Sequence, residues 1–366
     1  MRPADTWKDY ELLDATDGNR LERWGETILI RPDPQVVWKT PKQSPLWAKA
    51  DAVYHRSNQG GGEWEYKRRL PEKWKIHCGE GDDRLTLIVS PTGFKHTGVF
   101  PEQAVNWAWY QQKIRAAGRP VKVLNLFGYT GGATLACAAA GATVCHVDAS
   151  KGIVAWGKDN AVASGMADRP IRWLVDDCAK FVAREKRRGN TYDGIIMDPP
   201  SYGRGPGGEI WKLEDCIYDL ISQCEEVLSD KPLFFAVNSY TTGLSPAVME
   251  YMLKTTLVPR FGGKTSCDEI GLPVSATGGV VPCGKNKRKR PRPLSQTLRV
   301  CQLSQRESLW REGQLSGFAK GSPLGRAGAS APERARPLKI NKRSISTEWG
   351  TAPFGGAHHQ KEKTNE

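Results

Sequence analysis

Two short segments of this 366-residue chain carry residue types that could do chemistry, and each follows an apolar run. The first is the glycine-rich stretch Gly128-Tyr129-Thr130-Gly131-Gly132, which comes directly after Val121–Phe127. The second is Asp198-Pro199-Pro200-Ser201-Tyr202, at the end of another apolar run. Glycines at the end of a strand permit tight backbone angles and close approach by a ligand. The two segments together predict a ligand-binding turn beside a target-facing loop.

The glycine turn differs from the common phosphate-binding turns. It does not fit the G-x-G-x-x-G pattern of dinucleotide sites, and it lacks the G-x-x-x-x-G-K-[ST] pattern of a P-loop. S-adenosylmethionine (SAM) has no phosphate to cradle, which suits a glycine turn without lysine. We therefore expect Phe127 and the turn Gly128–Gly132 to bind SAM, with Asn125 at the charged amino-acid end of the cofactor.

Acidic residues end the two runs that follow the turn. Asp148 ends the run 142–148, and Asp176 and Asp177 follow the run 171–175. The carboxyl ends of parallel strands meet at the edge of a sheet where ligands bind. We expect Asp148 to accept from both ribose hydroxyls, and Asp176 or Asp177 to accept from the adenine amino group.

The loop Asp198-Pro199-Pro200 is predicted to orient the methyl acceptor. The sulfonium of SAM is already activated, so an enzyme has to supply proximity and alignment. Two prolines fix the backbone and remove two N–H donors, which leaves a rigid loop rich in acceptors. Tyr202 could stack on a flat target, and Lys212 could reach a phosphate or the target.

The methylated atom stays open at this stage. Amino-nitrogen methylases usually carry an aromatic residue directly after the two prolines, where this chain has Ser201. C5-cytosine methylation needs a Cys nucleophile, and the strand ending at Asn238-Ser239 has none. Cys216 and Cys224 lie eight residues apart on a predicted helix, as packed thiols would.

Strands and helices alternate from residue 121. Strands are predicted at 121–127, 142–148, 171–175, 193–198 and 233–238, and helices at about 100–117, 131–140, 151–164, 177–188 and 211–228. This alternation indicates the α/β class, with a parallel sheet covered on both faces. Segments 264–273 and 278–283 are expected to close it as an antiparallel pair, giving a Rossmann-like, mostly parallel seven-stranded sheet over 100–284.

Residues 1–99 differ in character and predict a small β-rich domain. Six of the 13 tryptophans lie before residue 76, and short runs such as 27–30 and 85–89 are punctuated by Pro and Gly. Two interpretations remain open: the tryptophans pack as an aromatic core, or they offer a face on which bases of single-stranded RNA stack.

The net charge of +13 is concentrated at the end of the chain. Residues 285–366 hold 18 Lys/Arg and 6 Asp/Glu, a net of +12, which leaves +1 for residues 1–284. The basic run 285–293 is typical of a nuclear-localisation or nucleic-acid patch, and a solvated segment without function is the alternative. The composition of 285–366 predicts a disordered tail.

Other classes of protein are disfavoured. The nine cysteines form no C-x-x-C pair and no zinc-type spacing, so no metal is expected. We expect no signal peptide, and no run approaches the ~20 apolar residues of a membrane span. A soluble, cytoplasmic protein without a membrane partner is predicted, and the oligomeric state stays open.

With these residues in hand, the chain resembles the class I SAM-dependent ribosomal RNA methyltransferases of the large subunit. These are the cytosine-C5 and guanine-N7 enzymes that share an LN-x-F-x-YTGG motif and a DPP motif. The matching segments are Leu124–Ala133, Val147–Ser150, Val175–Cys178 and Met197–Ser201.

The chain is most similar to a shorter bacterial branch that lacks the RNA-binding PUA domain, over about residues 10–284. Segment 91–103 is similar to that branch's entry into the catalytic domain, which implies that Phe100 and Gln103 contact SAM. Cytosine-C5 members place a Cys where Ser239 stands, which argues against that activity. Members of the family end near Gly284, and 285–366 match nothing in it.

The leading functional hypothesis is therefore a SAM-dependent methyltransferase acting on a base of RNA, in particular ribosomal RNA. A SAM-dependent methyltransferase of a small molecule or protein is the second hypothesis, supported by the near-neutral charge of residues 1–284. A non-catalytic RNA-binding module with a vestigial SAM fold is the third.

Overall fold

The structure is a computed structural model that describes residues 1–57, 61–93, 95–204, 210–241, 244–283 and 298–304. All of them belong to the first of two units along the chain, Met1–Leu309. Within these residues, no helix combines the length and the apolar character that a bilayer span requires.

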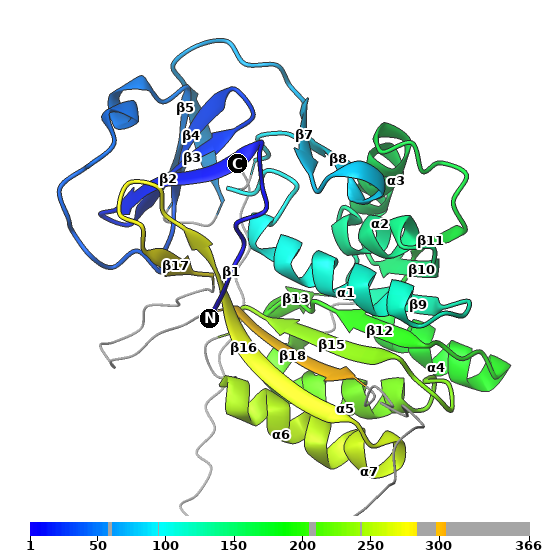
Figure 1. Cartoon of the computed structure of the whole chain (residues 1–366). Helices are drawn as coiled ribbons and strands as arrows, with labels where there is room; N and C mark the ends of the chain where they lie inside the picture. Colours follow the sequence, from blue (N-terminus) through cyan, green and yellow to red (C-terminus); the bar gives the residue numbers. More distant parts are fainter. Residues whose placement is uncertain (58–60, 94, 205–209, 242–243, 284–297, 305–366) are drawn as a thin grey trace, which may run out of the picture. The chain divides into compact units, whose positions relative to one another are not determined.

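A central sheet organises the fold (Figure 1). Its five parallel strands run in the order β11-β10-β9-β12-β15, and their bounds are Ile171–Val175, Thr143–Asp148, Lys122–Leu126, Gly194–Met197 and Phe234–Ser239. Beyond β15 come β18 (Leu298–Ser304), antiparallel to it, and β16 (Lys264–Pro273), antiparallel to β18. The five parallel strands confirm the predicted Rossmann-like sheet. Two short strands, β1 (Arg2–Pro3) and β17 (Val280–Pro282), pair with β16.

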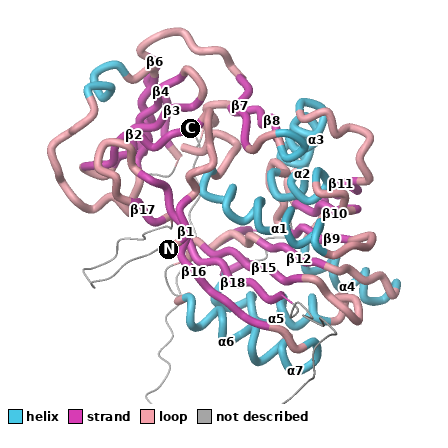
Figure 2. Tube along the Cα trace, viewed as in Figure 1, coloured by secondary structure: helices cyan, strands magenta, loops and turns pink. Residues whose placement is uncertain are grey.

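Helices cover both faces of this sheet (Figure 2). One face packs on α1 (Ala104–Ala116), α2 (Gly132–Ala139) and α3 (Lys151–Ala163). The other packs on α4 (Cys178–Arg188), α5 (Leu213–Glu225) and α6 (Pro246–Thr256), which the short α7 (Val258–Phe261) follows. Along β9, Val123 belongs to the first core and Leu124 to the second. Strands that are buried on both faces form nearly continuous apolar runs in the sequence. This explains why such runs predicted the positions of the strands.

The segment before α1 is β-rich, as predicted. A five-stranded sheet has the order β2-β3-β4-β5-β6, with bounds Tyr10–Thr16, Asn19–Trp24, Thr27–Pro32, Ala52–Arg56 and Gly62–Tyr66. Strands β7 (Trp74–Cys78) and β8 (Leu85–Val89) form a separate hairpin. Short 3₁₀ turns lie at Pro45–Lys49, Gly81–Asp83 and Pro101–Gln103.

The early tryptophans serve this core. Trp24 is fully buried, and Trp47 is buried with its Nε1 donating to Asp14 at 2.8 Å. Trp7, Trp38, Trp64 and Trp74 are partly buried against the core, and each indole N–H donates to a backbone carbonyl. Buried Trp N–H groups normally find such partners. These contacts favour the packed-core interpretation over a stacking face for RNA.

Strand β18 corrects the prediction of a structureless tail from residue 285. Its residues pair in register with β15 (Val237 opposite Cys301) and with β16 (Cys267 opposite Cys301). Segments 264–273 and 278–283 were expected to close the sheet as an antiparallel pair. They do pair, as β16 and β17, but β18 lies between β15 and β16 and completes the sheet instead. The basic run 285–293 lies outside the described residues.

Candidate active site

The glycine turn joins β9 to α2 through an unusual backbone path. Phe127 and Tyr129 have φ values of +55° and +50°, and Gly131 has +87°. The amide of Gly128 donates to Val147 O at 3.1 Å, and that of Gly131 donates to Gly128 O at 3.0 Å. Non-glycine residues with positive φ are uncommon and cluster at ligand sites. The predicted turn therefore exists, and its strain is of the kind found at binding loops.

Two glycines make room for side chains of the protein itself. A Cβ on Gly128 would lie 2.4 Å from Cε1 of His146, and one on Gly132 would lie 2.4 Å from Cζ2 of Trp107. The rings of Trp107 and His146 thus pack directly against the turn. Close internal packing, in addition to a ligand's approach, explains why these positions are glycine.

The polar residues under the turn bond to one another. Asn125 is buried, and its Nδ2 donates to Thr134 Oγ1 at 2.9 Å; this hydroxyl lies 2.9 Å from His146 Nδ1. Burial lowers the pKa of His146 to about 3, so its ring is neutral. Thr130 is also buried, and its Oγ1 donates to Gly98 O at 2.5 Å. Asn125 thus supports the turn through its hydrogen bond to Thr134, and its contact with a cofactor stays a prediction.

Asp148 lies at the end of β10 beside the turn. One carboxylate oxygen accepts from Tyr129 N at 3.0 Å, and the other accepts from Ser150 N at 2.9 Å. Burial raises the pKa of Asp148, and these two amides oppose that shift. An ionised carboxylate has about four acceptor positions. Acceptor positions therefore remain for two ribose hydroxyls, and the Asp148 carboxylate fits the nucleoside part of SAM.

The two acids after β11 have different tasks. The amide of Asp176 donates to Asp148 O at 3.0 Å, and the Asp176 carboxylate forms an ion pair with Arg184. Asp177 caps α4, since its Oδ1 accepts from Lys180 N at 2.8 Å. Asp176 therefore lies next to the proposed ribose ligand and Asp177 holds a helix start. The adenine role of either acid stays a prediction.

Gln103 connects the entry segment to the target loop. Its Nε2 lies 3.4 Å from Asp198 Oδ2 and 3.1 Å from the hydroxyl of Tyr240. Asn106 holds the other end of the Gln103 amide, donating to its Oε1 at 2.8 Å. The Phe100 ring lies 5.4 Å from that of Tyr129. Phe100 thus touches the glycine turn, and Gln103 links that region to the predicted target loop.

The segment after Pro200 folds into a hairpin that the sequence did not predict. Its strands are β13 (Tyr202–Arg204) and β14 (Ile210–Lys212), and Tyr202 pairs with Lys212. Trp211 fixes it: its Nε1 donates to Pro200 O at 2.7 Å, and its ring lies 5.5 Å from Phe127.

Tyr202 and Lys212 are exposed on the hairpin, as a role in target binding requires. The side chain of Tyr202 is 43% exposed. Lys212 directly precedes α5, and its Nζ lies 3.9 Å from Asp215 Oδ2 in an exposed ion pair. Pro199 is buried and Pro200 exposed, so the loop is anchored at one proline.

Tyr240 is a site residue that sequence reasoning missed. It follows β15, contacts Gln103, and donates from its hydroxyl to buried Glu102 Oε1 at 3.0 Å. Glu102 and Tyr240 are 138 residues apart, so no local pattern links them. An aromatic residue directly after an apolar strand, at the edge that already carries Asp198, was the available signal.

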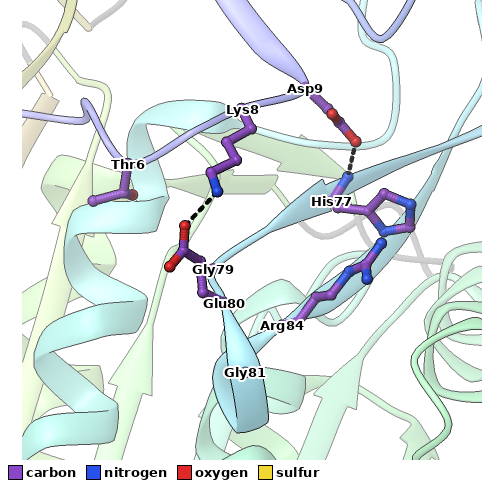
Figure 3. A pocket seen from close by; sticks show the side chains of 8 residues that line it. All are labelled: Thr6, Lys8, Asp9, His77, Gly79, Glu80, Gly81 and Arg84. Atoms are coloured by element: carbon purple, nitrogen blue, oxygen red, sulfur yellow. Dashed lines mark hydrogen bonds and ion pairs between the residues drawn. The ribbon is translucent and has the colours of Figure 1, made fainter.

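Figure 3 shows a second surface hollow of the protein. It is lined by the exposed Lys8 and Glu80, which form an ion pair, and by Asp9, which accepts from His77 N at 2.9 Å. None of the residues predicted for the SAM and target sites lines it. It carries no assignment.

Comparison with known proteins identifies the family. A model of the S-adenosylmethionine-dependent methyltransferase family matches residues 44–221. The solved structure of a SAM-dependent methyltransferase from Agrobacterium tumefaciens is 35% identical with a TM-score of 0.73, covering 83% of this chain and 93% of that one. The chain belongs to the SAM-dependent methyltransferase family.

Other matches agree with this placement. A putative SAM-dependent methyltransferase from Streptococcus mutans is 19% identical with a TM-score of 0.59, over 82% of this chain and 76% of that one, and shows the shared fold. Two curated relatives are named ribosomal RNA large subunit methyltransferase K/L. The one from Marinobacter nauticus is 29% identical over 60% of this chain, and the one from Shewanella baltica is 35% identical over 38%. The matches span only 28% and 19% of those longer relatives.

This methyltransferase uses SAM as its cofactor, which confirms the predicted enzyme class and cofactor. The assignment of individual residues to the cofactor or to the target stays a prediction, carried by the geometry described above.

Proposed function

We propose that the methyltransferase transfers the methyl group of SAM to a base of RNA, and that large-subunit ribosomal RNA is its substrate. The observation that carries this proposal is the link between the two halves of the site. Gln103 joins Asp198 to Tyr240, while Phe100 contacts the cofactor turn. The names of the curated relatives support RNA as the acceptor. Ribosomal RNA also implies a cytoplasmic site of action.

The protein's task in such a reaction is alignment. SAM supplies a methyl group that is already activated on a sulfonium. The Asp198 carboxylate lies at the end of β12, where it can accept from an N–H of the target base and aim its nitrogen. The carbonyl of Pro200 already accepts from Trp211 Nε1, and we assign the Asp198 carboxylate as the acceptor for the base. Exposed Tyr202 can stack on a flat target, and Lys212 beside it offers a cation to a phosphate.

The end of β15 favours a nitrogen over C5 as the acceptor atom. C5 chemistry needs a thiolate that attacks the ring. Ser239 stands there instead; it is fully buried, and its Oγ accepts from Thr241 N at 3.1 Å. Cys224, on α5, is fully buried, and burial raises the pKa of its thiol, which keeps it protonated.

Labelled methyl transfer tests this function. Full-length protein is incubated with radiolabelled SAM and one of three acceptors: large-subunit RNA transcribed in vitro, a protein extract or a metabolite extract. We expect label in the RNA. Asp198→Ala should abolish transfer while SAM affinity by calorimetry stays within a few-fold. Label only in protein or metabolites would assign the enzyme to the second hypothesis.

A further inference from the structure

A cavity lies where the N-terminal strands meet the entry segment of the catalytic region. Its walls include Arg20 of β3, Arg31 of β4, and His96, Phe100 and Glu102 of the segment that leads into α1. Tyr240, which follows β15, forms part of the same lining. The cavity therefore brings together three distant parts of the chain.

Hydrogen bonds connect this cavity to the target loop. Tyr240 donates to Glu102 at 3.0 Å and lies 3.1 Å from Gln103 Nε2, which in turn reaches Asp198 at 3.4 Å. The wall of the cavity is thus continuous with the residue assigned to the methyl acceptor. A group bound against Glu102 and Tyr240 would be connected to Asp198 through one side chain, that of Gln103.

Aromatic rings line the side of the cavity that faces the cofactor turn. The ring of Phe100 lies 5.4 Å from that of Tyr129 and 5.6 Å from that of Tyr240. His96 lies on the other side of Phe100, with ring centroids 5.3 Å apart. Such rings offer flat apolar faces, which suit a planar ligand.

Carboxylates pair with the two arginines of the cavity, and Lys95 Nζ donates to Pro32 O at 3.2 Å. Arg31 bonds to Glu22 through Nε at 2.5 Å and through Nη2 at 2.8 Å, and its Nη1 donates to Lys95 O at 2.9 Å. Arg20 forms an ion pair with Asp33, which also lines the cavity. These guanidiniums are held rigidly by carboxylates. The lining consequently suits an uncharged polar ligand better than a phosphate.

The size of the cavity points to one ring system. The centres of water molecules can occupy about 70 Å³ of it. At roughly 10–15 Å³ per water, this is room for about five to seven waters. That space suits a single base whose sugar and phosphate stay outside.

We propose that this cavity receives the target base of the RNA, so that the N-terminal β-rich region forms one wall of the substrate site. The inference rests on the proposed function and extends it: Glu102 and Tyr240 meet the polar edge of the base, and Phe100 packs against its face. The base enters between the N-terminal strands and the catalytic region, with its reacting nitrogen toward Asp198.

A blocking variant tests the proposal. His96→Trp places a larger ring at the cavity wall, and Thr6→Trp places the same ring in the unrelated hollow of Figure 3 as the matched control. Full-length protein is first saturated with S-adenosylhomocysteine, which fills the adenosine site. Saturation-transfer NMR then reports binding of adenosine, guanosine, cytidine and uridine, and initial rates are measured on unmodified large-subunit RNA.

We expect at least one nucleoside to bind the wild type, and His96→Trp to reduce that signal and kcat/KM on RNA at least tenfold. SAM affinity should change less than twofold, and Thr6→Trp should behave as wild type. Unchanged nucleoside binding in His96→Trp, or no nucleoside binding to wild type, would overturn the proposal. If a nucleoside binds and His96→Trp removes it while no RNA is methylated, the RNA function fails and the base site stands.

A second variant keeps the test decisive if His96→Trp loses SAM binding. Glu102→Gln preserves an acceptor for Tyr240 and adds an N–H donor to the cavity wall. It should change the relative affinities of the four nucleosides at least fivefold, so that a different one binds most strongly. An unaltered order of the four nucleosides would show that Glu102 does not meet the base.

Discussion

At the scale of single residues, Asp148 joins the cofactor turn to the end of β10. It accepts from the amides of Tyr129 and Ser150 and keeps acceptors for the ribose. Asp148→Ala should weaken SAM binding at least tenfold, because each charge-assisted bond contributes roughly 1.5–3 kcal/mol. Isothermal calorimetry measures this directly.

Asp148→Asn is the matched variant. Its single amide oxygen cannot serve both backbone amides and both hydroxyls, so SAM affinity should fall between that of wild type and that of Asp148→Ala. Unchanged affinity in both variants would remove Asp148 from the cofactor site.

Glu102 is a buried acid whose pKa is raised, first of all by loss of solvent. A carboxyl with a raised folded-state pKa stabilises the fold below its ordinary pKa, and that contribution is lost as pH rises through the folded value. At pH 7, above the ordinary carboxyl pKa, Glu102 therefore costs stability, and Glu102→Gln should raise Tm.

The gain should be about 2–4 °C for each kcal/mol recovered, and it should vanish near pH 4. Thermal melts at the two pH values test this, with exposed Glu63→Gln as the control that should change Tm little at either pH. An equal gain at both pH values would show that ionisation is not the cause.

At the scale of elements, the βα turn depends on the space that its glycines leave. Gly128→Ala drives a Cβ to 2.4 Å from the buried ring of His146. We expect a loss of roughly 1–3 kcal/mol in unfolding free energy, typical of overpacking, together with weaker SAM binding as the turn shifts.

Gly152→Ala is the matched control in α3, where the new Cβ meets nothing within 4 Å. It should stabilise the protein by about 0.5–1 kcal/mol, because alanine favours a helix. Urea unfolding measures both variants. Equal effects of the two substitutions would show that contact with His146 is unimportant.

Strand β18 allows a direct test of where the catalytic region ends. A chain ending at Gly284 loses the strand that lies between β15 and β16, so both keep unpaired edges. We expect it to aggregate or to melt without a cooperative transition. A chain ending at Leu309 keeps every described strand, and should melt and bind SAM as the full chain does, as circular dichroism and calorimetry would show.

The contrast between β12 and β18 shows what the sequence could predict. Strand β12 is the apolar run Gly194–Met197 before a loop with a clear motif, so its place and its role in the site were both predicted. Strand β18 has apolar residues at Leu298, Val300 and Leu303, but its flanks are rich in Ser, Arg and Pro. Its pairing partners lie far away in the chain. Local composition indicated disorder there, and only the partners reveal a strand.

The same limit applies to the candidate site. The glycine turn and the Asp198 loop carry local signals, and both were predicted with their residues. The Glu102–Tyr240–Gln103 bonds join residues up to 138 positions apart. The hairpin anchored by Trp211 depends on a contact with Phe127 that spacing does not encode. Non-local pairings of this kind need the fold.

At the scale of the whole molecule, the N-terminal region and the catalytic region are joined through several contacts. Strand β1 pairs with β16, Leu12 forms a bridge with Val274, and Trp7 donates to Pro101 O at 2.8 Å. These contacts tie the β-rich region to the segment that carries Phe100 and Gln103. These contacts would hold in place the wall that we propose this region contributes to the substrate site.

The charge of the molecule leads to the last prediction. Residues 1–284 have a net charge of +1, and the run 285–293 contains six Lys/Arg between β17 and β18. Changing these six to Gln keeps the chain length and every described strand. We expect SAM affinity and Tm to stay unchanged.

RNA binding of this variant should weaken, because contacts of Lys/Arg with phosphate act through counterion release. For single-stranded RNA, each lost phosphate contact should reduce the salt-dependence slope by about 0.7, so the total change is at most about 4. Fluorescence anisotropy at several salt concentrations measures the slope. An unchanged slope would show that the run 285–293 makes no phosphate contact, and would leave RNA binding to the rest of the chain, including the aromatic cavity and the exposed Tyr202–Lys212 pair.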